Sequence, residues 1–423
     1  MLTEDRPEPC TQHVSPRASI ISESRKPAGV RKAARSQESS DLPDNVSYLQ
    51  TPRRLMFVIE ALTVGGAEHM VVDLANEFVK RGDVVHVVCL SSLGELSSRL
   101  SPDVFVHLLN KKRGIDYKIP GRLRALAKKH RVQVVNSHLW TANLWTRIAL
   151  VRSGIPVVVT EHNRDVWKKL HNRIADRALS RVTAQLIAVS QDTANFYAED
   201  VGVDGKLISV VNNGVDTSLY ASGNGAALRS ELAAPGEFLI GTVGRLATAK
   251  NHPRLVEAAA IMRDAGVSVR VVIVGEGPQR DTTEACIADL NIGDRVTLLG
   301  ERSDVPDLLA AFDVFVLSSD REGHPLSALE AQAAGTPVVL TDAGGSADAV
   351  SRNEHGVGGL LVEKSAEALA ECLSALAVDP QRLQEMSAFA QSHASHHFDK
   401  TLMIDRYSEI FDKVKRNSII ANK

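Results

Sequence analysis

Two glutamates eight residues apart are well placed to act on a bound ligand. Glu322 and Glu330 bracket the segment EGHPLSALE, in which Gly323 and Pro325 end a strand-like run and precede a helix-like one. The first backbone amides of a helix have no partner inside it and attract phosphate. We expect Glu330 about two turns further on, within reach of a hydroxylated group attached to that phosphate. The alternative is a surface helix with two unrelated glutamates.

Two cations form a second candidate group. Arg245 follows another strand-like run in GTVGRLATAK, and Lys250 comes five residues later, just before a helix start marked by Asn251 and Pro253. Fixed cations at a helix terminus can stabilise a diphosphate as it leaves a sugar. The alternative is an ordinary pair of surface cations.

Candidate residues of the first half follow strand-like runs as well. Gly65 and Gly66 in LTVGGAEHM permit close approach of a ligand to the backbone, although a glycine pair is more often a tight turn. His138 and His162 end two later runs, and Asn143 follows His138 in the same predicted loop. Doubly wound sheets bind ligands at the carboxyl ends of their strands. Each histidine has the alternative role of a hydrogen-bonded structural residue.

The elements that position these residues form two series of short apolar runs separated by helical stretches. The first series holds seven runs, LMFVIE, DVVHVVCL, VFVHLL, VQVVNSH, IPVVVTEH, AQLIAVS and LISVV, and the second holds six, FLIGTVG, VRVVIVGEG, RVTLLG, VFVLSS, PVVLTD and GGLLVE. Such alternation predicts an α/β fold with a parallel sheet in each series. We expect Rossmann-like domains over residues 51–230 and 231–397.

The two ends of the chain differ from these series. Residues 1–50 are rich in Pro, Ser, Arg and Glu and have almost no apolar periodicity, which predicts a disordered extension or a mis-assigned start. Residues 398–423 carry apolar side chains at helical spacing from Phe398 to Val414, which predicts a last helix.

Taken together, these motifs resemble the retaining GT-B glycosyltransferases of family 4, the glycosyl transferases group 1. The E-x7-E signature at Glu322 and Glu330, the clamp at Arg245 and Lys250, the Gly-Gly loop and the turn NGVD before the linker occur in the family's order over residues 53–420. The resemblance implies two Rossmann-like domains facing each other across a cleft, with a C-terminal helix crossing back to the first domain.

The resemblance also implies roles for individual residues. Catalytic roles would fall to Glu322, which contacts the donor sugar, and to His162, which helps to place the acceptor. The donor site would comprise Gly65, Gly66, Arg245, Lys250, Gly323, His324, Pro325, Leu326, Ser327 and Glu330, and the acceptor region would include His138 and Asn143. His324 departs from the family, which usually has Phe there, and this puts the identity of the donor in doubt.

Other features concern metals and compartment. The four cysteines are scattered, which argues against disulfides and a structural zinc site, and Asp320 with Glu322 forms a D-x-E that the loop explains better than a metal. We therefore predict no metal and no required cofactor, only a nucleotide diphosphate sugar as donor substrate. No apolar run approaches a membrane span and the start lacks a secretory pattern, so a cytoplasmic protein is expected.

Charge divides unevenly between the two halves. Residues 51–235 hold 24 basic and 17 acidic side chains, whereas residues 236–423 hold 18 and 27. Basic residues gather at Lys111, Lys112, Arg113, Lys118, Arg122, Arg124, Lys128, Lys129 and Arg131. With Leu123 and Leu126 between them they predict either a cationic amphipathic segment resting on an anionic membrane, as a peripheral protein would, or a solvated helix. Nucleic acid is not expected, because stacking aromatics are not interleaved with these charges.

The expected function is that of a hexosyltransferase. A sugar would move with retention from a nucleotide diphosphate sugar, a UDP-sugar in preference to GDP-mannose, to a lipid-linked or saccharide acceptor in envelope polysaccharide or lipopolysaccharide synthesis. Two alternatives remain open: transfer to a soluble acceptor, and a nucleotide-sugar-binding protein that has lost turnover.

Overall fold

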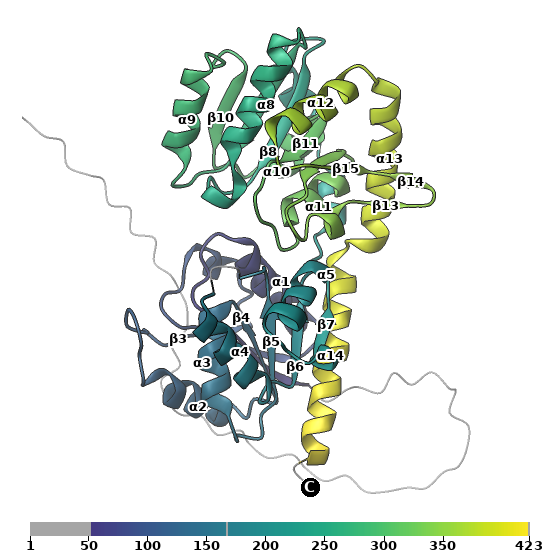
Figure 1. Cartoon of the computed structure of the whole chain (residues 1–423). Coiled ribbons are helices and arrows are strands. Elements are labelled where there is room, and N and C mark those ends of the chain that lie inside the picture. Colours follow the sequence, from purple (N-terminus) through teal and green to yellow (C-terminus); the bar gives the residue numbers. More distant parts are fainter. Residues whose placement is uncertain (1–51, 166–167, 422–423) are drawn as a thin grey trace, which may run out of the picture. The chain divides into compact units, whose positions relative to one another are not determined.

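A computed structural model describes residues 52–165 and 168–421 of the protein. The first domain is built on a parallel seven-stranded sheet (Figure 1). Its strands are β1 (Arg54–Ile59), β2 (Val84–Cys89), β3 (Phe105–Leu108), β4 (Val134–His138), β5 (Val157–Glu161), β6 (Gln185–Ala188) and β7 (Ile208–Val210). They lie in the order β3-β2-β1-β4-β5-β6-β7, and the direction of winding reverses between β1 and β4.

Both faces of this sheet are buried, which explains why its strands are continuous apolar runs. Leu55 and Phe57 of β1 pack in one core cluster and Met56 and Val58 in another, as alternate residues of a strand must. The covering segments are α1 (Gly66–Lys80), η1 (Glu95–Arg99), α2 (Ile119–Lys129), α3 (Trp140–Leu150), α4 (Leu170–Ser180), α5 (Gln191–Asn195), η2 (Phe196–Asp200) and η3 (Gly205–Leu207).

The apolar face of helix α2 is covered by protein, whereas the sequence allowed either a membrane-resting amphipathic segment or a solvated helix. Leu123 is completely buried and Leu126 packs against the same core cluster, so the apolar face of the helix covers the sheet. Large apolar groups are exposed instead in the preceding loop, where Ile115 is 68% and Tyr117 82% exposed. Asp116 holds this loop by accepting hydrogen bonds from the amides of Lys112 and Lys118.

The second domain is built on a parallel six-stranded sheet in the order β10-β9-β8-β11-β12-β15. Its strands are β8 (Phe238–Val243), β9 (Val269–Val274), β10 (Val296–Gly300), β11 (Val314–Leu317), β12 (Val338–Thr341) and β15 (Gly359–Val362), and β13 (Arg352–Asn353) with β14 (Gly356–Val357) forms a separate antiparallel hairpin. Its helices are η4 (Thr248–Lys250), α8 (His252–Asp264), α9 (Arg280–Asp289), α10 (Val305–Ala311), α11 (Leu326–Ala333), η5 (Ala347–Ala349), α12 (Ala366–Ala377) and α13 (Pro380–His397). The connecting helices α6 (Thr217–Ala221) and α7 (Ala226–Leu232) pack on this domain through Tyr220 and Leu228.

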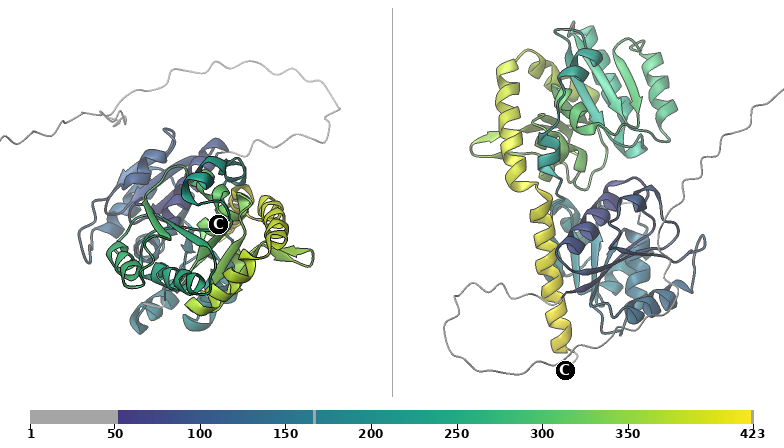
Figure 2. Two further views of the ribbon diagram at one scale, coloured as in Figure 1. Left: turned by 90° about the horizontal axis from the view of Figure 1, so that it is seen from above. Right: turned by 180° about the vertical axis from the view of Figure 1, so that it is seen from behind.

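The last helix, α14 (Lys400–Ala421), returns to the first domain. Ile404, Tyr407 and Phe411 lie in the core cluster that also contains Phe57 of β1, and α14 is the long yellow helix in the right-hand view of Figure 2. Phe398, expected inside this helix, instead ends α13 and packs in a core cluster of the second domain. The chain bends at Asp399, whose carboxylate accepts a hydrogen bond from the Thr217 hydroxyl.

The predicted fold is confirmed: each of the thirteen apolar runs contains one strand of the two sheets. The extension over residues 1–50 lies outside the described residues, and the boundaries at 230 and 397 stay predictions. Cys89, Cys286 and Cys372 are free thiols. Among the described helices, none combines the length and the apolarity that crossing a bilayer would require.

The packing of α14 predicts a large loss of stability for Phe411→Ala. This side chain is fully buried against Phe57 and Phe78, with ring centroids 6.1 and 5.5 Å away. Its removal should lower the free energy of unfolding by about 3–5 kcal/mol in chemical denaturation. Leu402→Ala, on the same helix but 46% exposed, should change it by less than about 1 kcal/mol. Equal effects of the two substitutions would show that α14 does not pack as described.

Candidate functional site

The predicted donor residues lie on loops at the point where the second sheet reverses its winding. Strands β8 and β11 are neighbours in the sheet, although β9 and β10 come between them in the sequence. The loop after β8 carries Arg245 and Lys250, and the loop after β11 carries Glu322. The carboxyl edge at such a reversal is the usual ligand site of a doubly wound sheet.

Lys250 and Glu322 form an ion pair that joins these two loops. The Lys250 Nζ lies 2.7 Å from Glu322 Oε1, and the Ser319 hydroxyl donates a 2.5 Å hydrogen bond to the same oxygen. The Glu322 side chain is 8% exposed and that of Lys250 is 24% exposed. The lysine is therefore held by a buried carboxylate while part of it remains accessible to a ligand.

Further hydrogen bonds fix the backbone around this pair. The Ser318 hydroxyl donates to the carbonyls of Lys250 and Asn251, and Arg254 donates to the Ser318 carbonyl. Arg254 also pairs with Asp320 at 2.6 Å. The two carboxylates of the D-x-E motif thus have separate cationic partners, as expected of a loop role.

Arg245 is the exposed member of the predicted clamp. Its side chain has no hydrogen-bond or ion-pair partner among the described residues. Burial raises the pKa of Glu68, and the charge of Arg245 opposes that rise. Sequence reasoning missed Glu68, which lies in the first turn of α1. A Cβ atom on Gly65 would lie 2.4 Å from its Oε2. The start of α1 therefore brings a carboxylate close to the clamp.

The start of α11 provides donors for an anion. The backbone amides of Gly323, His324, Leu326 and Ser327 have no acceptor among the described residues, and Pro325 has no amide hydrogen. Gly66 of the first domain lies near this turn, since a Cβ atom there would be 3.5 Å from the Leu326 side chain.

Glu330 lies one helical turn after Leu326, nearer the loop than the two turns expected. Burial raises the pKa of this carboxyl, and a hydrogen bond with the Tyr220 hydroxyl opposes that rise. Glu330 is therefore held beside the connecting helix α6 and remains within one turn of the free amides.

Gly323 brings the loop after β11 against the end of β5. A Cβ atom at this position would lie 1.7 Å from the His162 carbonyl oxygen, which no side chain could tolerate. Only glycine fits at this position. The carbonyl of His162, one predicted catalytic residue, therefore contacts the loop that carries the second one, Glu322.

The His324 side chain points into the protein. It is 4% exposed, its Nε2 donates to the Asp348 carbonyl at 3.2 Å, and its ring packs edge-on to Phe398. Burial lowers its pKa to about 4, so the ring is neutral at neutral pH. The His324 side chain thus fills an internal space, and only its backbone amide belongs to the free donors at the start of α11.

His138 and His162 are joined in a buried hydrogen-bonded chain. His138 Nε2 donates to Asn136 Oδ1 at 2.8 Å, and this leaves its Nδ1 to accept a 3.1 Å hydrogen bond from His162 Nε2. Asn136 donates to Thr160, whose hydroxyl contacts the Tyr407 hydroxyl of α14 at 3.3 Å. Burial lowers the pKa of His162 to about 4. This chain of hydrogen bonds fixes the tautomers of the two neutral imidazole rings.

Asn143 is engaged inside the first domain. It lies in α3 and not in a loop, accepts from the Ser137 hydroxyl at 2.7 Å and donates to the Thr160 carbonyl at 3.1 Å. Its place in the acceptor region would therefore be a supporting one.

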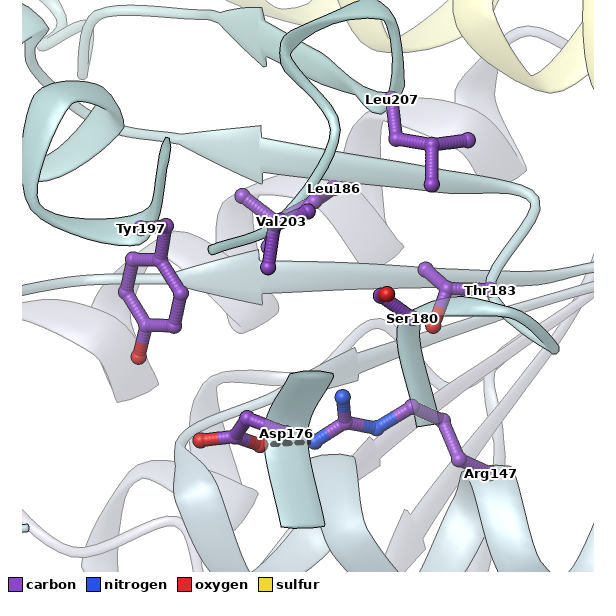
Figure 3. Close-up of a pocket in the computed structure, with 8 residues that line it drawn as sticks. All are labelled: Arg147, Asp176, Ser180, Thr183, Leu186, Tyr197, Val203 and Leu207. Carbon is purple, nitrogen blue, oxygen red and sulfur yellow. Dashed lines mark hydrogen bonds and ion pairs between the residues drawn. The ribbon is translucent and has the colours of Figure 1, made fainter. Parts of the chain in front are cut away.

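A buried ion cluster lies behind His162. Asp176 pairs with Arg147 at 2.6 Å (Figure 3) and with Lys168 at 2.8 Å, and all three side chains are at most 2% exposed. Lys168 also attracts the carboxylate of Glu161, the residue before His162, whose pKa burial raises. The crevice between these side chains has no room for a water molecule, which makes the cluster a support and not a ligand site.

Family models match both domains. Residues 226–393 match glycosyl transferases group 1, and residues 64–219 match glycosyltransferase family 4. A galactosyltransferase of Escherichia coli, named UDP-Gal:alpha-D-GlcNAc-diphosphoundecaprenol alpha-1,3-galactosyltransferase, is 31% identical over 298 residues, 66% of this chain and 76% of that protein. The chain belongs to glycosyltransferase family 4.

Other family 4 relatives differ in their named substrates. A D-inositol 3-phosphate glycosyltransferase of Nocardia farcinica is 34% identical over 284 residues, and the match spans 62% of this chain and 62% of that enzyme. Among solved structures, HepE of Anabaena in complex with UDP superimposes with a TM-score of 0.75 at 24% identity, over 85% of this chain and 100% of HepE. This likeness supports the GT-B fold.

The buried neutral His162 predicts a pH-dependent stability. An unfolded histidine has a pKa near 6.5, so the stabilisation from this residue is complete above about pH 6.5 and is lost as the pH falls towards about 4. Urea unfolding at several pH values gives the slope of the free energy of unfolding against pH. His162→Gln should reduce this slope by about 1 kcal/mol per pH unit in this window. His355→Gln, whose side chain is 78% exposed, serves as the control and should keep the wild-type slope. An unchanged slope in His162→Gln would contradict the buried, neutral state.

Proposed function

We propose that the protein transfers a sugar, with retention, from a UDP-sugar to a lipid-linked or saccharide acceptor in the synthesis of an envelope polysaccharide or lipopolysaccharide. The observation that carries this proposal is the Lys250–Glu322 pair beside the exposed Arg245 and the free amides of α11. Cations and oriented amides at one helix start suit a diphosphate.

The residues of the loops would share the work of stabilising the leaving group. Arg245 and Lys250 would neutralise the diphosphate, the amides that begin α11 would bind its oxygens, and Glu330 would accept hydrogen bonds from the ribose. Glu322 would hold Lys250 in place and contact the donor sugar. Such fixed charges favour the transition state in which negative charge grows on the leaving oxygen.

The chemical step needs no nucleophile from the protein. The bond between the anomeric carbon and the phosphate oxygen breaks, and a bond to the acceptor oxygen forms on the same face of the sugar. The acceptor proton passes to the departing phosphate oxygen. His162, neutral and fixed by His138, would place the acceptor, so catalysis would rest on positioning and charge stabilisation.

Two relatives favour uridine as the base. The galactosyltransferase relative is named for UDP-Gal, and HepE was crystallised with UDP, with UDP and glucose, and with UDP-glucose. GDP-mannose is the second candidate. If backbone groups recognise the base, the side chains of the site do not distinguish uracil from guanine.

A lipid-linked acceptor is favoured by the basic surface before and along α2. Lys112, Arg113 and Lys118 flank the exposed Ile115 and Tyr117, so cations and insertable apolar groups occur together. Such a surface binds an anionic membrane, where a lipid-linked acceptor lies. The name of the galactosyltransferase relative includes a diphosphoundecaprenol acceptor. A soluble acceptor is the alternative, since other relatives are named for inositol phosphate.

Arg245→Ala should weaken nucleotide binding. Losing one charge-assisted contact to the diphosphate predicts an about 10- to 100-fold higher Kd for UDP, measured by thermal shift and titration calorimetry. Arg295→Ala removes a cation that pairs with the exposed Asp294 of the same domain and should leave the Kd unchanged. The proposed clamp is contradicted if Arg245→Ala binds UDP as the wild type does. The proposed uridine base is contradicted if GDP or ADP stabilises the protein more than UDP.

The basic surface predicts sedimentation with anionic vesicles. Lys118→Glu combined with Arg122→Glu should weaken binding to phosphatidylglycerol vesicles about 30-fold or more and should leave UDP binding intact. Arg181→Glu with Lys206→Glu makes the same change of charge at exposed positions elsewhere in the domain and serves as the control. Wild-type protein that stays in the supernatant would remove the membrane role and favour the soluble acceptor.

A further inference from the structure

Three histidines from distant parts of the first domain meet at one edge of its sheet. His86 lies in β2, His107 in the edge strand β3, and His130 at the end of α2. One ring nitrogen of each lies within 4.8 Å of the others, and Nδ1 of His86 is 3.1 Å from Nε2 of His107. None of the three belongs to the site described above.

The backbone sets this histidine cluster in place. His86 is opposite Phe105 in the parallel ladder and His107 is opposite Val88, so the two histidines are diagonal neighbours on one face. Helix α2 leads back from β3 and ends at His130, whose amide donates to the Leu126 carbonyl. The three rings are thus brought together by the sheet and its crossover helix, before any ligand binds.

The chemistry of the cluster is that of a metal site. The rings lie 4.4 to 5.3 Å apart between centroids, and Nε2 of His86 is buried without a hydrogen-bond partner in the described part of the chain. Nδ1 is the nitrogen of His86 that faces His107, so Nε2 would keep the ring proton when Nδ1 binds a cation. Nδ1 of His86 and Nε2 of His107 face each other in a 3.1 Å hydrogen bond, which a cation bound between the two rings would replace.

We propose that His86, His107 and His130 bind a zinc ion. Three imidazoles without carboxylates suit Zn²⁺ and the neighbouring divalent transition metals and do not suit Mg²⁺ or Ca²⁺. Two nitrogens on one tetrahedral zinc lie about 3.3 Å apart, so the His86–His107 spacing already fits and His130 needs only a small movement. Water or a small anion takes the fourth position, because the nearby charges are those of Arg54 and Lys129.

A metal here ties β2, β3 and α2 together. Strand β3 is an edge strand with Phe105, Val106 and Leu108 partly exposed, and α2 carries much of the basic surface. The ion therefore has a structural role in the first domain. Neither the pattern of cysteines nor local spacing predicted it, because the histidines are 21 and 23 residues apart in the sequence.

The test is zinc titration of the full chain, without an affinity tag and after dialysis against a chelator. Calorimetry should give one Zn²⁺ per chain, and His107→Ala and His130→Ala should each weaken binding about tenfold or more. Zinc should also raise the Tm of the wild type and not of these variants. Cobalt should give the visible absorption of a tetrahedral site in the wild type, a readout that does not depend on how the variants fold.

The matched control is His397→Ala. His393 and His397 form a stacked pair on α13 with ring centroids 4.1 Å apart, a second group of neighbouring histidines remote in sequence from the cluster. Unchanged zinc affinity in this variant supports the histidine cluster. The proposal is overturned if the wild type binds no zinc at micromolar concentrations, if both cluster variants bind like the wild type, or if binding disappears in His397→Ala.

Discussion

The arrangement of the donor loops depends on one ion pair, that of Lys250 with Glu322. A carboxylate that is 8% exposed would be unfavourable without a cation, and the 2.7 Å contact with Lys250 and the Ser319 hydrogen bond provide its partners. Because the two residues come from loops after neighbouring strands, the pair fixes the distance between these loops. The exposed cation of Arg245 and the free amides of α11 keep their positions relative to one another for that reason.

Close backbone approach extends this constraint to the first domain. Gly323 has no space for a Cβ atom beside the His162 carbonyl, and Gly345 has none beside the carbonyl of Gly323. Behind His162, the buried chain through His138 and Asn136 leads to Thr160 and the C-terminal helix. The fold therefore holds a neutral histidine and a carboxylate from different domains on adjoining loops.

Much of this could be predicted from the sequence, because parallel strands buried on both faces give continuous apolar runs and because phosphate-binding loops need particular residues at particular spacings. The E-x7-E loop and the pair Arg245 and Lys250 have such spacings, and their binding of a diphosphate stays a prediction. Contacts between side chains that are far apart in the sequence could not be predicted in this way. The pairing of Lys250 with Glu322, the inward turn of His324 against Phe398 and the place of Glu68 depend on tertiary packing, which has no local signal. The positions of Leu123 and Leu126 are compatible with a membrane-resting segment and with a solvated helix, and the sequence pattern does not show that the sheet covers them.

The most direct test of the central claim is a crystal structure of the full chain with UDP bound. The account predicts that the diphosphate lies at the start of α11, within hydrogen-bond distance of Arg245, of Lys250 Nζ and of the amides between Gly323 and Ser327, with Lys250 still paired to Glu322. A diphosphate bound elsewhere, or one that contacts neither cation, would contradict it.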